Sequence, residues 1–467
     1  DKIMKKMRKI FAVLLTLAMV LAMSIPTFAA QPNTATITVD KLTPNDNTTV
    51  SIYQVVKFND AQSKWEVSDW VGEALKKDST LVNLEVEPAV INYEELYKKY
   101  LPTTPTATKT KINDSSVDFT GLEVGAYLIT ASGNTTSYTV MGAATYDYGE
   151  NNNLIKPIDA KVNAKGEKYT VVKSLVNTNQ AFVMKGDTVE FNIDTVFPSY
   201  DPKNINRTFT IKDKPTGMKI TAVEVTVGGT PVGAENYTVT GLNEKNTEVT
   251  VAFKDTYIGK SNEHAAQAVR VKVTAVVTSD DGSYKNEATS NYDSDPSEVI
   301  GRSGSLTIYK TTNEEKVEDR NPLTGAKFSI VKTVDGEADK SLEFVELEAG
   351  KYTLYTEDTE IPEGKTKVTE VTVGADGKVL LKGLGAGTYK ITETLAPEGY
   401  SINNNIPNAR ISAGENNENI EINVPDSKLS ALPSTGGIGT TIFTIAGCLI
   451  MVTAAGLFFA SRKRTNK

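Results

Sequence analysis

The segment Val269-Arg270-Val271-Lys272-Val273-Thr274-Ala275-Val276-Val277-Thr278 alternates apolar and polar side chains over most of its length. Successive side chains of a β-strand point to opposite faces, so this period of two predicts a strand with one buried face. The same alternation occurs over residues 188–195 and 224–227. The residues that recur in these runs, chiefly Val, Thr, Ile and Tyr, favour strands. We therefore expect an all-β fold, with a short helix over residues 92–100.

The charge distribution separates the chain ends from the part between them. The 467 residues include 50 Lys and Arg against 58 Asp and Glu, a formal net charge of −8. The first 30 residues and the tail after Ala460 together carry +8, which leaves −16 on the remainder. So acidic a surface repels nucleic acid and anionic lipid, and we expect no nucleic-acid partner. The remaining length, about 400 residues, suggests about three domains.

The C-terminal end begins with a short motif that an apolar segment follows. The motif L-P-S-T-G consists of Leu432, Pro433, Ser434, Thr435 and Gly436. The apolar run 438–460 is long enough to cross a hydrocarbon core of ~30 Å as a helix, and the basic residues after it are expected to stay cytoplasmic. This order of parts resembles the cell-wall sorting signal of Gram-positive bacteria. The resemblance implies cleavage between Thr435 and Gly436 by a sortase and anchoring at the cell wall.

The N-terminal end predicts export. Basic residues from Lys2 to Lys9 precede an apolar segment, 10–23, and small residues at Ala29 and Ala30. This pattern is typical of a signal peptide, so residues 1–30 are expected to be removed. The single cysteine, Cys448, lies in the C-terminal apolar run. The exported part therefore has no disulfide, and any covalent brace within it must be another bond.

The third module, residues 303–430, opens with a strand that ends at Lys310 and later contains Y-K-I-T-E-T-L-A-P-E-G-Y, residues 389–400. This string resembles the E-box of pilin subunits and of collagen-adhesin B-type domains. The resemblance implies an isopeptide bond from Lys310 to the last strand, with Glu393 as the catalytic acid. Asp426 fits the expected spacing for the acceptor, and Asn423, which has the commoner chemistry, is the alternative.

Elementary chemistry supports such a reaction. Burial among apolar side chains pushes a lysine toward its neutral, nucleophilic amine. Burial also pushes a glutamic acid toward its protonated form, which can polarise a side-chain carbonyl. A fold that holds the amine against that carbonyl replaces a bimolecular encounter with a fixed geometry.

The middle module, residues 166–302, contains K…GDTVEF…FTIKDKPTGM…NEA. This sequence resembles the middle, isopeptide-forming domain of fimbrial backbone subunits. The resemblance implies a bond between Lys173 and Asn286, with Asp213 as the buried acid. A crosslink between the first and last strands closes a loop of about 110 residues, and by analogy with a disulfide it restrains the unfolded chain by ~4–5 kcal/mol.

The first module, residues 31–165, repeats part of the third. G-L-E-V-G-A-Y-L-I-T at 121–130 matches G-L-G-A-G-T-Y-K-I-T at 383–392. Ala131 then stands where the third module has Glu393, and Lys41 in the opening strand has no acid partner. We expect the same kind of sandwich here without an internal isopeptide bond.

A backbone pilin also needs a lysine that attacks Thr435 of the next subunit. The familiar Y-P-K-N motif is not intact in this chain. Lys161 lies at the module boundary, twelve residues before Lys173, where the family's linking lysine belongs. Lys203, within Y-D-P-K-N, matches the motif more closely but falls in a predicted loop of the middle module. Its position at the module boundary favours Lys161 as the linking lysine, and Lys203 is the alternative.

These resemblances imply tandem immunoglobulin-like, collagen-adhesin-type β-sandwich domains, followed by the sorting signal at 431–467. The implied function is the structural shaft subunit of a covalent cell-surface pilus, and the alternative is a monomeric wall-anchored adhesin. The implied partners are a sortase, identical subunits, minor pilins, peptidoglycan and a host ligand. An enzyme is disfavoured, because His264 is the only histidine and no nucleophile–histidine, metal-ligand or phosphate-loop motif occurs. No cofactor or metal is expected.

Overall fold

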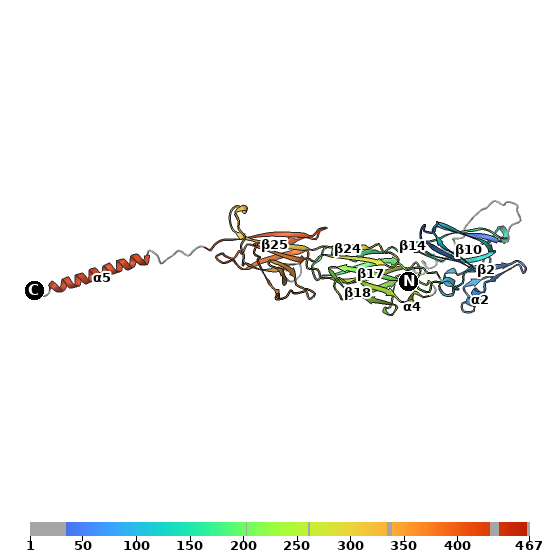
Figure 1. Cartoon of the computed structure of the whole chain (residues 1–467), viewed down its shortest axis with the longest axis horizontal. Coiled ribbons are helices and arrows are strands. Elements are labelled where there is room, and N and C mark those ends of the chain that lie inside the picture. The colour runs from blue at the N-terminus through green and yellow to red at the C-terminus, as the bar shows by residue number, and fades with distance from the viewer. Residues whose placement is uncertain (1–33, 202, 260–261, 334–338, 430–438, 465–467) are drawn as a thin grey trace.

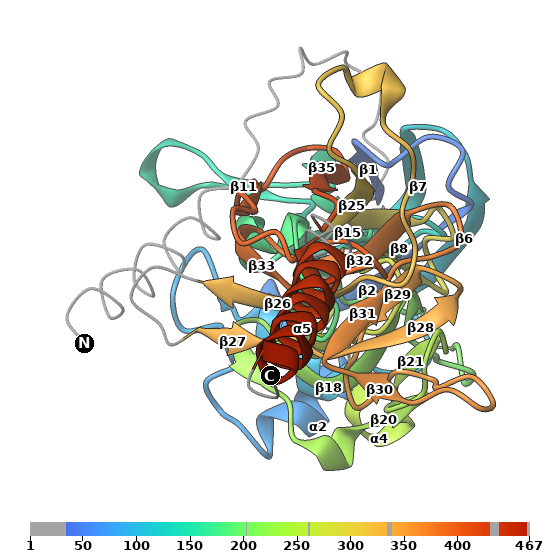
Figure 2. The same cartoon turned by 90° about the vertical axis from the view of Figure 1, so that its left-hand side faces the viewer.

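A computed structural model describes residues 34–429 and 439–464, except 202, 260–261 and 334–338. Three β-rich modules follow one another along the long axis (Figure 1), and they overlap in projection when viewed along that axis (Figure 2). The predicted signal peptide and the L-P-S-T-G motif lie outside the described residues. In the described part the all-β prediction is confirmed for the modules, since each forms two main sheets around an apolar core.

The first module has a three-stranded sheet, β13 (Ala160–Asn163), β1 (Thr34–Asp40) and β7 (Ser116–Glu123). The second sheet contains β14 (Gly166–Lys168), β9 (Thr136–Tyr138), β8 (Gly125–Ser132), β2 (Thr48–Asn59) and β3 (Lys64–Val67), with β10 (Met141–Ala144) on β8 and β6 (Ala107–Ile112) on β2. Two small ladders are β4 (Val82–Asn83) with β5 (Val90–Ile91), and β11 (Asp147–Tyr148) with β12 (Leu154–Ile155). The short helices are α2 (Asp69–Leu75), α3 (Tyr93–Glu95), η1 (Leu96–Tyr100) and η2 (Glu150–Asn152).

The predicted helix over 92–100 is confirmed as α3 and η1. Asn92 caps it, because its side chain accepts a hydrogen bond from the Glu95 N–H. Two expectations about this module need correction. Lys41 does not lie in the opening strand, since β1 ends at Asp40. The module boundary also lies later than residue 165, because β14 pairs with β9 in the sheet of the first module.

The middle module is a sandwich of two five-stranded sheets. One sheet contains β15 (Val172–Leu175), β16 (Thr188–Val196), β22 (Ala268–Val277), β18 (Met218–Val227) and β19 (Thr230–Pro231). The other contains β20 (Tyr237–Thr240), β21 (Val249–Phe253), β17 (Thr210–Thr216), β23 (Tyr284–Ser290) and β24 (Ser297–Gly301). The short helices are η3 (Thr178–Ala181), η4 (Ala234–Asn236) and α4 (Asp255–Ile258). The three alternating segments of the sequence lie in β16, β18 and β22, as predicted.

The third module packs a six-stranded sheet against a five-stranded one. The first contains β30 (Lys367–Val368), β28 (Phe344–Glu348), β29 (Lys351–Leu354), β32 (Lys378–Leu384), β25 (Gly304–Thr312) and β35 (Glu418–Asp426). The second contains β27 (Lys340–Ser341), β26 (Lys327–Thr333), β33 (Gly387–Leu395) and β34 (Ala409–Ile411), with β31 (Glu370–Thr372) on β26. The helices that follow in the chain are η5 (Val317–Asp319), between β25 and β26, and the C-terminal α5 (Gly439–Arg464).

The middle and third modules share a packed junction. Phe182 and Met184, from the connection between β15 and β16, belong to the apolar core of the third module. The Lys185 N–H donates to the Gly383 carbonyl over 2.9 Å. Gly383 adopts a φ of 79°, and a Cβ at this position would lie 3.0 Å from the Lys185 Cβ. Glycine is therefore required there both for its backbone conformation and for the close approach of the two modules.

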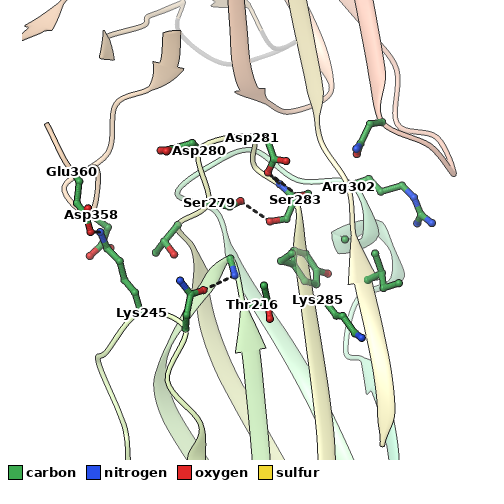
Figure 3. A pocket seen from close by; sticks show the side chains of 17 residues that line it. Thr216, Lys245, Ser279, Asp280, Asp281, Ser283, Lys285, Arg302, Asp358 and Glu360 are labelled. Carbon is green, nitrogen blue, oxygen red and sulfur yellow. Dashed lines mark hydrogen bonds and ion pairs between the residues drawn. The ribbon is translucent and has the colours of Figure 1, made fainter. Parts of the chain in front are cut away.

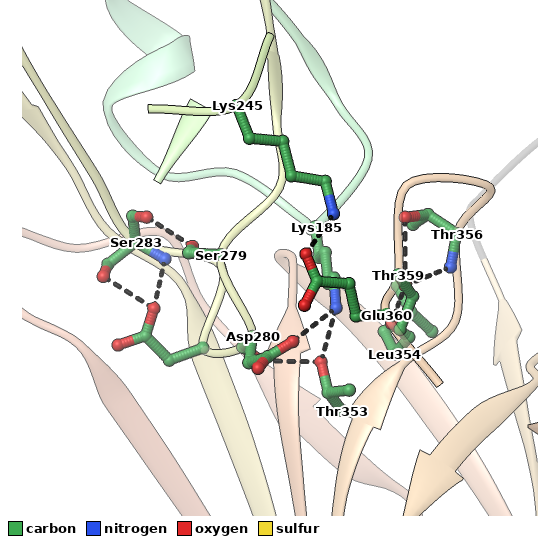
Figure 4. Close-up of polar contacts among 11 residues, drawn as sticks. Lys185, Lys245, Ser279, Asp280, Ser283, Thr353, Leu354, Thr356, Thr359 and Glu360 are labelled. Carbon is green, nitrogen blue, oxygen red and sulfur yellow. Dashed lines mark hydrogen bonds and ion pairs between the residues drawn. The ribbon is translucent and has the colours of Figure 1, made fainter. Parts of the chain in front are cut away.

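Polar contacts add to this junction. The Lys185 Nζ donates to Asp280 Oδ1 and to Thr353 Oγ1, each over 2.9 Å (Figure 4). The Lys185 side chain is fully buried, and this burial lowers the pKa of its ammonium group. Lys219 of the middle module pairs with Asp358 of the third over 2.6 Å. The junction thus combines a shared apolar core with ion pairs and hydrogen bonds.

A solvent-accessible cavity of about 710 Å³ lies at the same junction (Figure 3). Its lining includes Lys245, Asp281, Lys285, Asp358 and Glu360. The charged side chains that line it are of both signs, and one pair, Lys245 and Glu360, is joined over 3.3 Å. The opposite charges offset one another, so the cavity has no dominant charge.

Candidate crosslinking sites

The two sheets of the middle module bring three predicted residues together in its core. Lys173 lies on β15 of one sheet, whereas Asp213 on β17 and Asn286 on β23 lie in the facing sheet. The strands β17 and β23 are antiparallel, with Pro215 opposite Asn286. Since Asp213 is two residues from Pro215, its side chain points to the same, inward face. All three residues are buried.

Asp213 contacts both of its predicted partners. Lys173 Nζ donates to Asp213 Oδ1 over 2.5 Å, and Asn286 Nδ2 donates to Asp213 Oδ2 over 3.2 Å. Asn286 Oδ1 is buried and accepts no hydrogen bond from the described residues. Lys173 Nζ also lies 4.7 Å from the centroid of the Phe191 ring. The amine therefore sits between an aromatic face and a carboxylate, beside an amide.

Burial shifts the proton equilibria of this cluster. Desolvation lowers the pKa of Lys173, and the attraction of Asp213 opposes the shift only in part. Desolvation likewise raises the pKa of Asp213, against the influence of Lys173. Both shifts favour the neutral forms, an amine and a carboxylic acid. These are the forms that nucleophilic attack on an amide with acid assistance requires.

The third module assembles its cluster differently. Lys310 on β25 and Asp426 on β35 belong to parallel neighbouring strands, with Lys310 opposite Val424 and Thr312 opposite Asp426. Glu393 comes from β33 in the facing sheet. Lys310 Nζ lies 2.8 Å from Glu393 Oε1 and is also in contact with Asp426 Oδ1. All three side chains have 0% exposure.

The alternation of β35 separates the two candidate acceptors. Val424 and Asp426 are buried, whereas Asn423 is exposed on the opposite face. The structure therefore brings Asp426, and not Asn423, to Lys310. Desolvation raises the pKa of Asp426 to about 6, although the neighbouring Lys310 acts in the opposite direction. The proton on this carboxyl group is thus held at a higher pH than usual.

The first module shows no comparable cluster among its described residues at the positions expected by homology with the third. Ala131 is buried on β8, and Lys41 is exposed with a φ of 61° after the end of β1. One feature of the middle cluster, the Phe191 ring beside Lys173, was not predicted. The sequence does contain a signal for this contact, because Phe191 lies on the inward face of the alternating run 188–195.

The two candidate linking lysines lie in different settings. Lys161 is on β13, its side chain is 55% exposed, and its Nζ pairs with Asp40 Oδ2 over 2.8 Å. This ion pair holds the pKa of Asp40 below its usual value. Lys203 is exposed in a loop, as predicted. That loop is anchored by the buried Arg207, whose Nε donates to the Asn204 carbonyl over 3.1 Å.

The C-terminal apolar run forms the helix α5, in which Ile442–Phe459 is long and apolar enough to cross a membrane. Its side chains are mostly exposed where they are described. This agrees with a segment whose surroundings are lipid. Within the described ranges, no group of three or more His, Cys, Asp and Glu residues is arranged to hold a metal ion. His264, the only histidine of the chain, is half-buried and stacks on Tyr257, with ring centroids 4.3 Å apart.

Comparisons with known proteins agree with this architecture. Residues 304–428 match the model of the SpaA prealbumin-like fold domain, and residues 424–467 match the LPXTG cell wall anchor motif. The fimbrial subunit type 2 of Actinomyces naeslundii is 26% identical over 66% of this chain, which spans 63% of that relative's length. The trypsin-resistant surface T6 protein of Streptococcus pyogenes is 23% identical over 74% of this chain and 79% of its own.

Among solved structures, the major pilin SpaA of Corynebacterium diphtheriae shares 18% identity, with a TM-score of 0.39 over 85% of this chain and all of that one. The SpaA-type domain, the anchor motif with its apolar helix and the fimbrial relatives point to one class of protein. The chain thus carries a SpaA-type prealbumin-like domain and an LPXTG cell-wall anchor, and it is similar to fimbrial subunits of Gram-positive bacteria.

Proposed function

We propose that this chain is a pilin, the shaft subunit of a covalent pilus, and that two internal isopeptide bonds brace it. The observation that carries the proposal is the pair of buried clusters, each of which places a lysine of the module's first strand beside a carboxyl group and an acceptor. The acceptor of the third module lies on its last strand, β35, whereas Asn286 of the middle module lies on β23, the strand before the last and not the last strand expected from the sequence. Structural ion pairs are rarely buried so completely without a further role, because desolvating both charges is costly. Formation of an amide removes both charges from the core.

In the middle module, Lys173 Nζ attacks Cγ of Asn286. A new C–N bond forms, the Cγ–Nδ2 bond breaks, and ammonia leaves. Protonated Asp213 donates a hydrogen bond to the amide oxygen while the tetrahedral centre forms, then accepts the proton that the attacking nitrogen loses and gives a proton to the leaving nitrogen. Rotating the Asn286 side chain by half a turn would bring its unpartnered Oδ1 to Asp213, as this role requires.

In the third module, Lys310 Nζ attacks Cγ of Asp426, and one carboxyl oxygen leaves as water. Glu393 acts as the proton donor and acceptor. Since Lys310 Nζ is already in contact with Asp426 Oδ1 and lies 2.8 Å from Glu393, the cluster resembles a near-attack geometry. The reaction occurs once in each chain, so it is a maturation step without turnover.

Polymerisation would use the sorting signal. A sortase cleaves the Thr435–Gly436 amide, holds Thr435 as a thioester, and transfers it to a lysine amine of the next subunit. We propose Lys161 as that lysine, because it is exposed and lies at the boundary between the first two modules. Lys203 remains the alternative, since its anchored loop also presents an exposed amine. Minor pilins, peptidoglycan and a host ligand are further proposed partners.

The intact mass of the mature chain, residues 31–435, tests the internal bonds. The expected result is loss of one ammonia and one water, with peptide maps joining Lys173 to Asn286 and Lys310 to Asp426. Loss of two ammonias would move the second acceptor to Asn423. An unchanged mass would refute both bonds.

Co-expression of the full chain with a pilus sortase tests polymerisation. We expect a ladder of detergent-resistant multimers, with a branched peptide joining Thr435 to Lys161. Lys161→Arg should abolish the ladder, whereas Lys212→Arg, at a surface lysine of the middle module, should not. A ladder lost only with Lys203→Arg would assign the link to the alternative lysine. Monomers alone would favour the wall-anchored adhesin.

A further inference from the structure

The chain after the E-box turn lies alongside the end of β35. The Ser401 N–H donates to the Ser427 carbonyl over 3.0 Å, and the Leu429 N–H donates to the Gly399 carbonyl over 2.9 Å. Residues 399–403 therefore follow the chain that leaves the acceptor strand. β35 is the outermost strand of its sheet, so its outer edge has no neighbouring strand. The segment after the E-box covers part of this edge.

Asn403 in this segment makes three hydrogen bonds. Its backbone N–H donates to Glu393 Oε2 over 2.7 Å. Its side-chain Nδ2 donates to the Pro425 carbonyl over 2.8 Å. Its Oδ1 accepts from the Asn405 N–H over 2.8 Å. One half-buried residue thus connects the carboxyl group of the acid with the peptide bond that precedes Asp426.

We propose that Asn403 is a positioning residue for the crosslink of the third module, because it holds Glu393 and the Asp426 strand in one register. The inference rests on the isopeptide bond proposed above. The backbone N–H occupies Glu393 Oε2, which leaves Oε1 facing Lys310 Nζ at 2.8 Å. The Asn403 side-chain amide donates to the Pro425 carbonyl and thereby fixes the orientation of the peptide bond from which the Asp426 side chain extends.

Asn403 does not touch the reacting atoms, so its effect would act through geometry. Reactions between held groups depend steeply on alignment, and a displacement of about 1 Å can cost on the order of 100-fold in rate. Without the Nδ2 donor, the end of β35 is free to move relative to Lys310. The fold itself does not depend on this bond, since β35 keeps its ladder with β25 along nine residues.

The test follows bond formation in newly made chains. The full chain is synthesised during a short pulse of labelling, sampled at intervals and analysed by mass. Loss of water reports the third module, and loss of ammonia in the middle module serves as an internal clock. The variants are Asn403→Ala, Asn403→Asp and, as a matched control, Asn404→Ala at the exposed neighbouring position. The aspartate variant keeps the acceptor for the Asn405 N–H but lacks the donor to Pro425.

We expect both Asn403 variants to slow water loss at least about tenfold relative to ammonia loss, and Asn404→Ala to leave the ratio unchanged. A purely structural role would instead lower the melting temperature in a Lys310→Ala background, where no bond can form, and would leave the ratio intact. That result, or a normal ratio in both Asn403 variants, would overturn the proposal. If the unsubstituted chain loses ammonia but no water, the proposed crosslink itself fails, independently of Asn403.

Discussion

Lys310 contacts Asp426 across two parallel neighbouring strands, β25 and β35, of a single sheet. The middle module differs, because Lys173 belongs to one sheet and Asn286 to the other. The proposed bond of the third module therefore joins adjacent strands, with the acid supplied by the facing sheet. That of the middle module joins the two sheets, with acid and acceptor supplied by the same sheet.

Replacing Asp213 by Asn should prevent the bond of the middle module. The carboxamide fills the same space but cannot exchange a proton with Lys173 and Asn286. The chain should keep the ammonia, and the middle module should lose ~4–5 kcal/mol of stabilisation from loop closure. This corresponds to a fall in melting temperature of roughly 10–20 °C. Calorimetry and intact mass measure both effects.

A matched control for this change is Asp194→Asn, which removes a surface ion pair with Arg270. Such pairs contribute about 0–1 kcal/mol, so ammonia loss should remain complete and the melting temperature nearly unchanged. Ammonia loss that persisted in Asp213→Asn would show that another group supplies the acid.

Glu393→Gln should stop water loss in the third module while leaving ammonia loss in the middle module intact. Gln keeps the size of the side chain but cannot transfer a proton. Tandem mass spectrometry should then find the Lys310 and Asp426 peptides unlinked. Glu398→Gln is the control, since this exposed residue lies in the turn that follows β33. Linked peptides in Glu393→Gln at the normal rate would exclude the proposed role.

The protonation of Asp426 should change close to neutral pH. Burial raises the pKa of Asp426 to about 6, so the carboxyl group holds its proton below pH 6 and loses it as the pH rises through that value. In Glu393→Gln, where Lys310 and Asp426 are expected to stay unlinked, infrared spectra should show the band of a protonated carboxyl group disappear as the pH rises through about 6. A carboxyl group that is already fully ionised at pH 5 would contradict this assignment.

Phe182→Ala should destabilise the third module although Phe182 belongs to the middle one by sequence. The side chain is 8% exposed and packs in the third module's core, so truncation should cost ~3–5 kcal/mol. Calorimetry should show the transition of the third module shifted downward, and Glu393→Gln identifies which transition that is. Val176→Ala, at a position 44% exposed, should have little effect. A shift confined to the middle module would contradict the packing.

Local patterns predicted much of this structure. Period-two alternation located β16, β18 and β22, and the same rule applied to Ile420, Ile422 and Val424 places Asp426 on their inward face. The lysines and acids of the two clusters came from resemblance, since no local rule pairs residues 40 positions apart, as Lys173 and Asp213 are, or further. The role of Asn403 was not predicted either, because its partners Glu393 and Pro425 lie 10 and 22 residues away on different strands.

The boundary between modules was also beyond local patterns. The sequence around Phe182 and Met184 indicates buried side chains. It does not indicate whether they are buried in the core of the middle module or in that of the third. Likewise, β14 continues the chain toward the middle module but hydrogen-bonds to β9. Contacts between distant segments, which no period in the sequence reports, decided both outcomes.

The insertion of Phe182 and Met184 into the neighbouring core has a consequence for inheritance and engineering. A recombination event at the apparent boundary near Arg302 would deliver a third module without the two side chains that complete its interior. In the chimera, the new third module would have an unfilled apolar space in its core. The middle module would carry two apolar side chains that do not match that core. Exchange between pilins at this junction is therefore expected to succeed only when the connection between β15 and β16 is transferred together with the third module.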